Sequence, residues 1–482
     1  MYRGLVQAGV TPFAGVLGDR FNRKYIVAAG TVLWGCFAAG FGLSQTYSQV
    51  SAMAALNGVG LALVMPACQS LIADLYDPQQ RGRAFGVIMT VAALGAMLGT
   101  FFATSIGASW VAGIEGWRLA FYVVAGISGA TCLLTLACVV EPRVARVGDP
   151  QSANPSDEEV PPQRPPASAK LLGVAPIAGR DTAHEGDKGR LGGRVAEAFV
   201  GVGRMLGGML CVMWRMLHIP SFSIIMVEHI IGNLQSISGY KIIYFQLLGF
   251  SDVVTGAMSA CTTAGVAVGF IIGGTLGDML SLVMPDYARP AVNQFSVVIA
   301  APLAALLYKG MPGRAALASG IQGSQNYLAW RYSLLLFSVG SLTSWSAVNN
   351  AVILAEVVPS RERSQVYAFD RCVGGFVGAL SNVIVPLIAQ YGFHYSKDHN
   401  PRPEGHQTAA QKTVTAAENL LVYSGLYWTL PRDRVKAAIR EAHESGIIGP
   451  RRSAPMSSGY GSGGPALDGK ASARTDAGEE AD

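Results

Sequence analysis

An acidic residue and a histidine, Glu228 and His229, stand side by side within an apolar segment that runs from about residue 219 to 247. They lie about nine residues into this segment, and at a rise of about 1.5 Å per residue this is roughly 13 Å along a helix. That depth is close to the midplane of a bilayer, where a charged side chain costs ~2.5–3.5 kcal/mol on insertion. A carboxylate and an imidazole placed there can bind and release a proton. We therefore predict a coupling or ligand-contacting site, and a hydrogen-bonded structural couple is the alternative that the residues leave open.

A second charged pair, Asp370 and Arg371, lies inside the apolar segment 366–392. Adjacent residues on a helix do not face each other, so each of the two needs a partner of its own. A structural lock between helices is the favoured interpretation of this pair. Contact with a substrate is the alternative, and both residues remain candidates for transport or coupling.

Isolated polar residues recur in other apolar segments. Taken singly, each fits an interhelical hydrogen bond worth ~0.6 kcal/mol on average. Taken together, they mark a polar cavity between helices better than any one of them does. The residues predicted to line this cavity are Asn57, Gln69, Asn233, Tyr240, Trp345, Asn349 and Asn350.

The sequence contains no arrangement of residues that is typical of an enzyme. It has no glycine-rich Walker A loop that ends in lysine, no His-Glu-x-x-His and no Gly-x-Ser-x-Gly. The seven cysteines form no Cys-x-x-Cys pair, so neither a zinc site nor a disulfide framework is indicated. We expect no catalysis, no cofactor and no metal. The net charge of +5 is small and spread out, so no nucleic-acid partner is expected.

The composition is that of a membrane protein. Half of the residues are apolar, 14% are charged and 58 are glycine, and glycine-rich apolar helices pack closely in membranes. A spanning helix needs ~20 mostly apolar residues. Such segments occur at about 26–43, 52–74, 84–110, 118–140, 219–247, 253–277, 291–308, 332–358 and 366–392, with shorter ones at 3–17 and near 417–430. We predict an all-α, multi-pass integral membrane protein with ten spanning helices and one short C-terminal helix.

The charges in the connections predict the orientation of these helices. Connections 19–24, 77–83, 278–289 and 359–363 are rich in charge, whereas 44–51 and 109–116 are nearly free of cations. Cytoplasmic connections accumulate lysine and arginine. The charged set is therefore expected on the cytoplasmic side.

Changes of composition along the chain predict five regions. Residues 1–140 form an N-terminal helical bundle, and 141–190 form a disordered, proline-rich cytoplasmic linker. Residues 191–218 are predicted to form an amphipathic helix at the interface. A C-terminal bundle follows over 219–430, and 431–482 form a mostly disordered cytoplasmic tail.

One short motif occurs once in each half of the chain. Gly15-Val16-Leu17-Gly18-Asp19 ends the first apolar segment, and Gly274-Thr275-Leu276-Gly277-Asp278 ends another far downstream. Three cations, Arg20, Arg23 and Lys24, follow the first copy within five positions. Charges this dense must lie in water at the membrane edge. The repeat indicates two related halves.

The chain resembles the major facilitator superfamily, and within it most closely the spinster-like branch, including plant and algal relatives. The residues that carry the resemblance are Gly18-Asp19-Arg20-Phe21-Asn22-Arg23-Lys24-Tyr25, Leu56-Asn57-Gly58-Val59-Gly60-Leu61-Ala62, Ser70-Leu71-Ile72-Ala73-Asp74, Gly116-Trp117-Arg118, Ile219-Pro220-Ser221-Phe222, Ala355-Glu356-Val357-Val358-Pro359 and Tyr367-Ala368-Phe369-Asp370-Arg371. The resemblance implies two pseudo-symmetric bundles that carry out secondary transport by alternating access. It also implies an organic, amphiphilic, lipid-like solute such as a lysolipid or sphingolipid, with proton coupling as one option.

The resemblance further implies a conformational lock on the cytoplasmic side. Asp19 is expected beside residues 361–368 at the start of helix 11 of the family pattern. By pseudosymmetry, Asp278 is expected beside residues 81–88. The residues assigned to this lock are Asp19, Arg20, Arg23, Lys24, Asp278, Arg361 and Arg363.

Two departures from the family pattern keep another interpretation open. Asp19 follows the second helix of the pattern, so the chain as given begins inside that helix and its first helix is expected to be absent. Leu56 and Leu61 also stand where spinster relatives carry charged residues. The alternative is therefore a non-transporting membrane scaffold or sensor, or an inactive product of a truncated gene model. The oligomeric state stays open.

Overall fold

The computed structural model describes residues 2–142, 207–234, 245–307, 322–387 and 420–444, apart from positions 108, 112 and 247. It also describes the single residues 203, 311 and 418. Contacts join Met1–Glu441 into one unit, and Ala442–Asp482 form a second. The description below concerns the first unit.

The N-terminal half consists of five helices and a short hairpin. They are α1 (Tyr2–Arg20), α2 (Arg23–Leu43), α3 (Tyr47–Leu75), α4 (Arg81–Ile106), β1 (Trp110–Val111), β2 (Ile114–Glu115) and α5 (Gly116–Cys138). Polar residues set the helix starts: Asn22 accepts a hydrogen bond from the Lys24 amide, and Thr46 and Gln49 form a capping box. Such caps satisfy amides that have no acceptor within their own helix.

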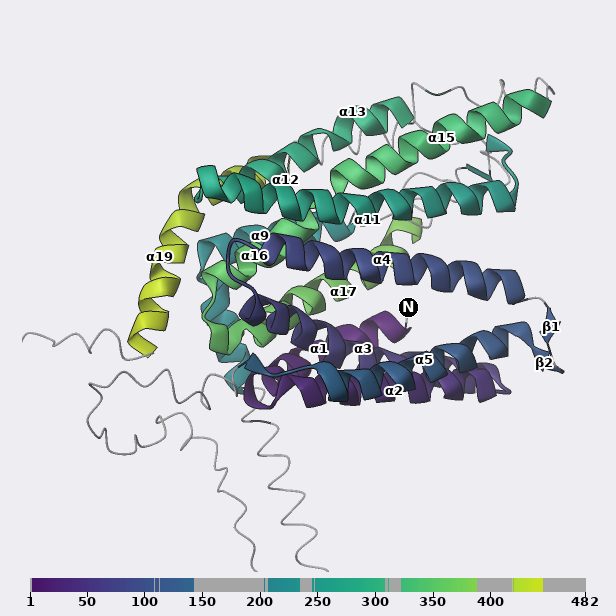
Figure 1. Ribbon diagram of the computed structural model, residues 1–482, viewed down its shortest axis with the longest axis horizontal. Coiled ribbons are helices and arrows are strands. Elements are labelled where there is room, and N and C mark those ends of the chain that lie inside the picture. The colour runs from purple at the N-terminus through teal and green to yellow at the C-terminus, as the bar shows by residue number, and fades with distance from the viewer. Residues whose placement is uncertain are drawn as a thin grey trace, which may run out of the picture. The chain divides into compact units, whose positions relative to one another are not determined.

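The C-terminal half continues the pattern after the linker. It contains a helix over Gly207–Leu217, followed by α9 (Pro220–Leu234), α11 (Asp252–Val283), α12 (Ala288–Val298), α13 (Ala300–Ala305), α15 (Gln322–Thr343), α16 (Trp345–Val357), the 3₁₀ turn η3 (Ser360–Glu362), α17 (Arg363–Leu387) and α19 (Leu426–Glu444). Figure 1 shows α1 to α5 on one side and α11 to α15 on the other, with their long axes roughly parallel.

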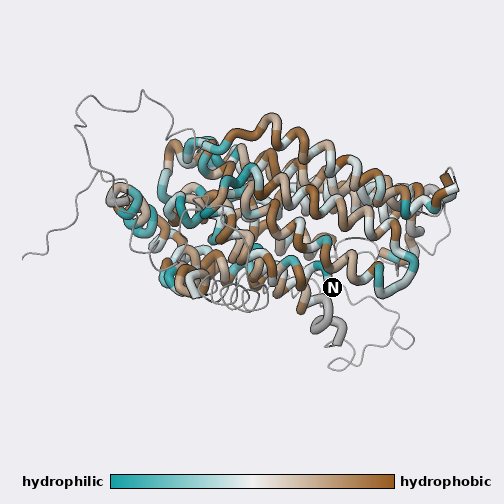
Figure 2. Tube along the Cα trace, turned by 90° about the horizontal axis from the view of Figure 1, so that it is seen from below, coloured by the Kyte–Doolittle hydropathy of each residue, from teal (hydrophilic) through white to brown (hydrophobic). Residues whose placement is uncertain are grey.

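The predicted apolar segments match these helices closely. Within the described residues, five helices are long and apolar enough to cross a membrane, or six if a bent pair counts as one span. Hydrophobic residues dominate the long helices, and hydrophilic residues gather at the end where α19 lies (Figure 2). Parts of several segments lie outside the described residues, so ten spans with an empty first position stays a prediction.

Two of the expected boundaries differ from the structure. The segment expected at 332–358 begins earlier, at Gln322, and is divided at Ser344 into α15 and α16. The Ser344 hydroxyl donates to the Val266 carbonyl of α11, and a Cβ at Gly269 would lie 2.2 Å from that hydroxyl. The break therefore lies at a place where α11 packs closely against this segment. The tail expected from 431 is helical as far as Glu444, as part of α19.

The two halves meet along two helix pairs. Within the N-terminal half, α3 packs against α1 and α2, and α2 packs against α5. Across the halves, α1 packs along α17 and α4 packs along α11. Both crossings depend on glycine, because a Cβ at Gly15 would lie 2.6 Å from Ala368 Cβ and one at Gly274 would lie 2.1 Å from the Gly82 carbonyl oxygen. The repeated motif therefore supplies the surface on which the halves touch.

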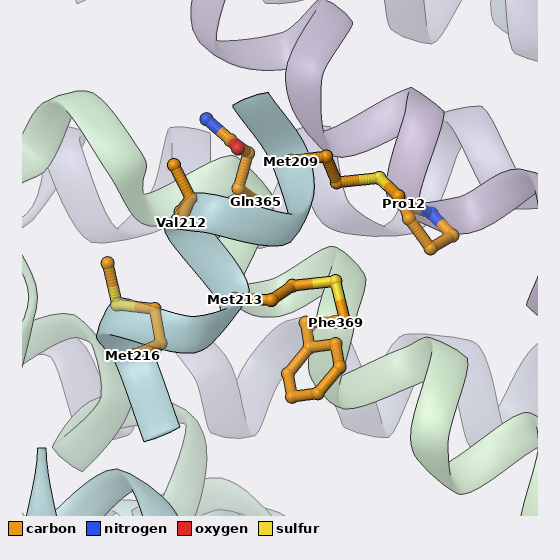
Figure 3. A pocket seen from close by; sticks show the side chains of 7 residues that line it. All are labelled: Pro12, Met209, Val212, Met213, Met216, Gln365 and Phe369. Atoms are coloured by element: carbon orange, nitrogen blue, oxygen red, sulfur yellow. The ribbon is translucent and has the colours of Figure 1, made fainter. Parts of the chain in front are cut away.

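The helix over Gly207–Leu217 lies across the α1–α17 crossing. It meets α9 at an angle of 97°, so it runs across the direction of the spanning helices. Its inner face closes a small apolar pocket with residues of α1 and α17 (Figure 3), lined by Pro12, Met209, Val212, Met213, Met216, Gln365 and Phe369. Arg215 of this helix pairs with Glu362 of η3. The rest of the predicted amphipathic helix, 191–206, and the linker 143–190 lie outside the described residues, apart from residue 203.

Substitution of Gly274 tests the close crossing of α4 and α11. Gly274→Ala should lower the thermal midpoint of the detergent-purified protein, because overpacking a tight contact costs ~1–3 kcal/mol. Gly256→Ala is the matched control in the same helix, since no atom lies within 4 Å of the added Cβ. The control should keep or raise the midpoint, because alanine favours a helix by up to ~1 kcal/mol over glycine. Equal midpoints for both variants, measured by thermal unfolding with fluorescence-detected size exclusion, would contradict this account.

Candidate transport site and cytoplasmic closure

Arg23 is completely buried at the start of α2, within a ring of acceptors. Its guanidinium contacts Asp74 at 2.7 Å and Glu141 at 2.9 Å, and it donates to the Ser70 hydroxyl. The Arg23 amide also donates to Glu141. A buried charge needs such partners, because desolvation without them costs several kcal/mol. The ends of α2, α3 and α5 are therefore held together by one cation.

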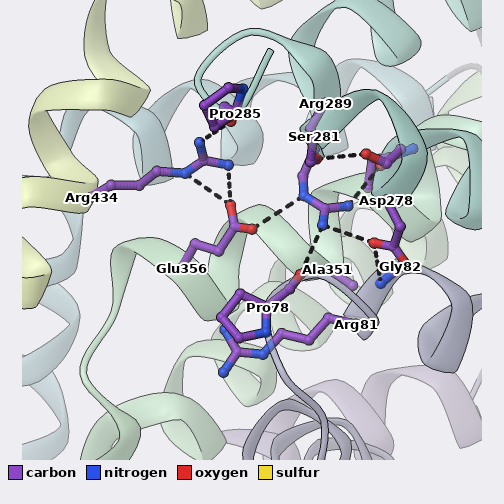
Figure 4. A network of polar contacts seen from close by, with 12 residues as sticks. Pro78, Arg81, Gly82, Asp278, Ser281, Pro285, Arg289, Ala351, Glu356 and Arg434 are labelled. Carbon is purple, nitrogen blue, oxygen red and sulfur yellow. Dashed lines mark hydrogen bonds and ion pairs between the residues drawn. The ribbon is translucent and has the colours of Figure 1, made fainter. Parts of the chain in front are cut away.

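Arg289 occupies the corresponding place in the C-terminal half, at the start of α12 (Figure 4). It is 1% exposed and contacts Asp278 at 3.0 Å and Glu356 at 3.2 Å. It also donates to Asn349 and to the Pro78 carbonyl of the other half. Arg434 of α19 reaches the second oxygen of Glu356 at 2.5 Å. This second network ties α11, α12, α16 and α19 together.

Two carboxylates cap helices of the opposite half. Asp19 accepts hydrogen bonds from the amides of Ser364 and Gln365, both at 3.1 Å. Asp278 accepts from the amides of Gly82 at 2.9 Å and Arg83 at 2.7 Å. The predicted neighbours, 361–368 for Asp19 and 81–88 for Asp278, are thus confirmed. A carboxylate at a helix start is stabilised by the free amides and the helix dipole.

Side-chain contacts across the halves accompany these caps. Arg363 of α17 pairs with Asp74 of α3 at 2.5 Å, and the hydroxyls of Ser364 and Ser70 lie 2.9 Å apart. Of the other residues assigned to the lock, Arg20 and Arg361 are exposed and Lys24 is half-buried. The contacts close these ends of the two halves against each other, and their cytoplasmic orientation stays a prediction. Their role as a conformational lock stays a prediction.

Farther along the helices, Glu228 contacts the neighbouring C-terminal helices. Its Oε2 accepts a hydrogen bond of 2.8 Å from Asn350 of α16, and Tyr423 also hydrogen-bonds it. Asn350 lies 2.9 Å from the Tyr423 hydroxyl and accepts from Asn293 of α12. Glu228 therefore has fixed partners within its own half, which agrees with the structural alternative as well as with a proton-binding role.

His229 and Asp370 form the second part of this cluster. His229 Nδ1 lies 2.6 Å from Asp370 Oδ1, so α9 and α17 are joined by an imidazole–carboxylate pair. Arg371, the next residue of α17, points to the other half, where its Nε lies 3.5 Å from Gln69 Oε1 of α3. The two adjacent residues have different partners, as the helix geometry requires.

The other predicted cavity residues have different environments. Asn57 donates to the Trp34 carbonyl of α2, and Asn233 donates to the His229 carbonyl of its own helix. For Asn349 and Trp345, a place in the cavity lining stays a prediction. Asn349 is 0% exposed and bound to Arg289, and Trp345 stacks on Phe295 of α12, so packing within the half covers both. Tyr240 lies outside the described residues.

Several residues of the networks were not predicted as site residues. Asp74 and Glu356 were expected only to carry the family resemblance, and no role was predicted for Glu141, Arg289, Arg434 or Tyr423. The equivalent positions of Ala73-Asp74 and Ala355-Glu356 near the ends of their helices, one in each half, are a signal that could have found the first two. Among the described residues, no group of three His, Cys, Asp or Glu side chains is placed to hold a metal ion.

Comparison with known proteins identifies the family. The sequence pattern of the Major Facilitator Superfamily matches residues 2–382. The chain belongs to the Major Facilitator Superfamily. It is accordingly a multi-pass integral membrane protein of two pseudo-symmetric helical bundles, and it stands among transporters rather than enzymes.

Solved structures of this superfamily share the fold. The proton:xylose symporter XylE, bound to 6-bromo-6-deoxy-D-glucose, superposes with a TM-score of 0.56 at 15% identity, over 87% of this chain and 83% of that chain. The human organic anion transporter MFSD10 (TETRAN) gives a TM-score of 0.52 at 16% identity, over 88% of this chain and 82% of that chain.

Curated relatives match over shorter segments. Multidrug resistance protein 3 of Bacillus subtilis (strain 168) is 32% identical over 23% of this chain and 22% of its own length. Protein spinster homolog 1 of Bos taurus is 31% identical over 30% of this chain and 28% of its own length. The quinolone resistance protein NorA of Staphylococcus aureus is 24% identical over 31% of this chain and 37% of its own length. The matched segments thus span about a quarter to a third of these relatives.

Removing the charge of Asp19 tests the closure on the cytoplasmic side. Asp19→Asn should favour opening there, because a partly buried carboxylate at a helix start is worth up to ~2 kcal/mol, which is a change of up to roughly 30-fold in a two-state ratio. The measurement is the alkylation rate of a cysteine introduced at Ala368, which is 0% exposed beside Gly15, in a background without the natural cysteines. Asp77→Asn, in an exposed loop, is the control. A rate that Asp19→Asn leaves unchanged would refute a locking role.

Replacing Arg289 tests whether the second network holds the C-terminal helices together. Arg289→Gln should destabilise the protein by ~3–5 kcal/mol, because it leaves the buried carboxylate of Asp278 without its cation, while Glu356 keeps its contact with Arg434. Arg289→Lys keeps the charge and should lie between this variant and the natural protein. Arg331→Gln, at an exposed arginine stacked on Tyr327, should change the thermal midpoint little. Comparable midpoints for Arg289→Gln and Arg331→Gln would contradict the assignment.

Proposed function

We propose that this protein is a secondary active transporter that moves an organic, amphiphilic, lipid-like solute by alternating access. The observation that carries the proposal is the symmetric closure: each half contributes one carboxylate that caps a helix of the other half. Alternating access needs two bundles whose contacts can form on one side of the membrane and break together. Backbone amides capped by a side chain of the opposite half meet that need, since water can replace the carboxylate when the halves separate.

The solute class rests on the kind of relative that the chain resembles. Several matched relatives are named for organic solutes: multidrug resistance protein 3, a probable 4-methylmuconolactone transporter and the quinolone resistance protein NorA. Assignment to the spinster-like branch, and with it the lipid-like solute, is supported by the segment shared with protein spinster homolog 1. The predominantly apolar helices are compatible with a solute that has a long hydrocarbon part.

We further propose proton coupling at the cluster around Glu228 and His229. Glu228 contacts Asn350 and Tyr423, and His229 contacts Asp370. The remaining charged group near them is Arg371, which is close enough to His229 for their charges to interact. Two carboxylates and an imidazole in one apolar region can share protons among themselves, and their proton occupancy changes when one of them gains access to water.

Uptake into proteoliposomes tests the function. The purified full chain is reconstituted, a pH gradient is imposed, and uptake of a labelled lysophospholipid and of a labelled sphingoid base is measured against protein-free liposomes. Uptake that depends on the protein and on the gradient supports a proton-coupled transporter. Protein-dependent uptake without gradient dependence would remove the coupling. Absence of uptake for all solutes in a folded protein favours the alternative, a non-transporting scaffold or sensor.

Glu228→Gln separates the coupling role from the structural one. In the coupled transporter this variant should flatten the pH dependence of uptake, because glutamine keeps the size of the side chain and one acceptor oxygen and cannot exchange a proton. Glu115→Gln, in the hairpin beside α5 and paired there with Arg118, should keep the pH profile of the natural protein. If Glu228→Gln folds and keeps that profile too, Glu228 is structural and Asp370 is the next residue to replace.

A further inference from the structure

Arg371 lies inside the membrane, above the cytoplasmic closure. It is eight residues beyond Arg363, the first residue of α17, which at 1.5 Å per residue is about 12 Å along the helix. Arg363 and Ser364 make the contacts that close the cytoplasmic ends. A guanidinium at this depth is costly, so its surroundings should explain it.

The side chain of Arg371 points from one half to the other. Its neighbour Asp370 turns to His229 of α9 within the C-terminal half. Arg371 instead turns to Gln69 of α3 in the N-terminal half. It therefore lies at the interface between the two halves, where a solute must pass if the halves alternate their access.

The partner of Arg371 is weak for a buried cation. The single hydrogen bond, from Nε to the neutral amide oxygen of Gln69, is 3.5 Å long, at the far limit for such a bond. Arg23, Arg289 and Arg363 by contrast all contact carboxylates. Among the described residues, Arg371 makes no other hydrogen bond and no ion pair. A half-buried guanidinium with two unused nitrogens has the donors that an anion requires.

We propose that the Nη atoms of Arg371 bind the anionic headgroup, a carboxylate or a phosphate monoester, of the amphiphilic solute. This proposal rests on the proposed function, because it places a solute between the halves. The planar guanidinium can hold two oxygens of such a headgroup at once. The apolar helices on both sides then face the hydrocarbon tail.

Equilibrium binding to the full chain in lipid nanodiscs tests this site without relying on transport. The probes share one acyl chain and differ in the headgroup: a fatty acid, a lysophosphatidate and a monoacylglycerol. We expect at least one anionic probe to bind about tenfold more tightly than the neutral one, and the two anionic arms distinguish carboxylate from phosphate. Arg371→Gln should remove this preference, and Arg371→Lys should keep part of it as a point charge.

Controls separate this site from a loss of folding and from the proposed function. Arg331→Gln, an exposed arginine in α15, should keep the preference, and unchanged binding of the monoacylglycerol to Arg371→Gln shows that the fold is intact. Equal binding of charged and neutral probes, an unchanged preference in Arg371→Gln, or no binding of any probe overturns the proposal. Binding that depends on Arg371 without uptake refutes the transporter alone, and uptake that ignores Arg371 refutes the anion site alone.

Discussion

The structure depends on one physical constraint, which is that backbone amides at a helix start have no acceptor within their own helix. In this protein, two such pairs of amides take their acceptors from the opposite half, through Asp19 and Asp278. The hydrogen bonds that cap the starts of α17 and α4 are therefore the same ones that hold the two halves together. Separation of the halves requires water to take the place of both carboxylates, so a partial opening leaves amides without acceptors. This makes two discrete arrangements more stable than the positions between them.

The two arginine networks are alike in charge and differ in what they connect. Around Arg23, the second cation is Arg363, which comes from the opposite half and shares Asp74. Around Arg289, the second cation is Arg434 of the same half, which shares Glu356. Both networks make contacts across the halves. In the first network, Arg363 pairs with Asp74. In the second, Asp278 accepts from the amides of Gly82 and Arg83, and Arg289 donates to the Pro78 carbonyl. Separation of the halves would therefore break an ion pair in the first network and hydrogen bonds to backbone groups in the second.

The sequence predicted those features that depend on residues close together in the chain, such as helices and short motifs. Most of the apolar segments predicted their helices to within several residues, with 332–358 as an exception that begins at Gln322 and is divided into α15 and α16. The repeated Gly-x-Leu-Gly-Asp motif, together with the family resemblance, predicted the neighbours of Asp19 and Asp278. The partner Glu141 of Arg23 lies 118 residues away, and no period or motif indicates which helix ends converge. The burial of Asn349 and Trp345 could not be predicted for the same reason: a polar residue in an apolar helix can face a cavity or a neighbouring helix, and only packing decides which.

Among the charged residues around Glu228 and His229, one makes a hydrogen bond that crosses from one half to the other. Glu228 is bound to Asn350 and Tyr423, and His229 is bound to Asp370, all within the C-terminal half. These contacts can stay intact while the halves move as rigid bodies. Arg371 is the member of this group whose hydrogen bond, to Gln69, crosses to the other half. Rocking of the halves would therefore change the hydrogen bond of Arg371 while the contacts of Glu228 and His229 within the C-terminal half stay in place.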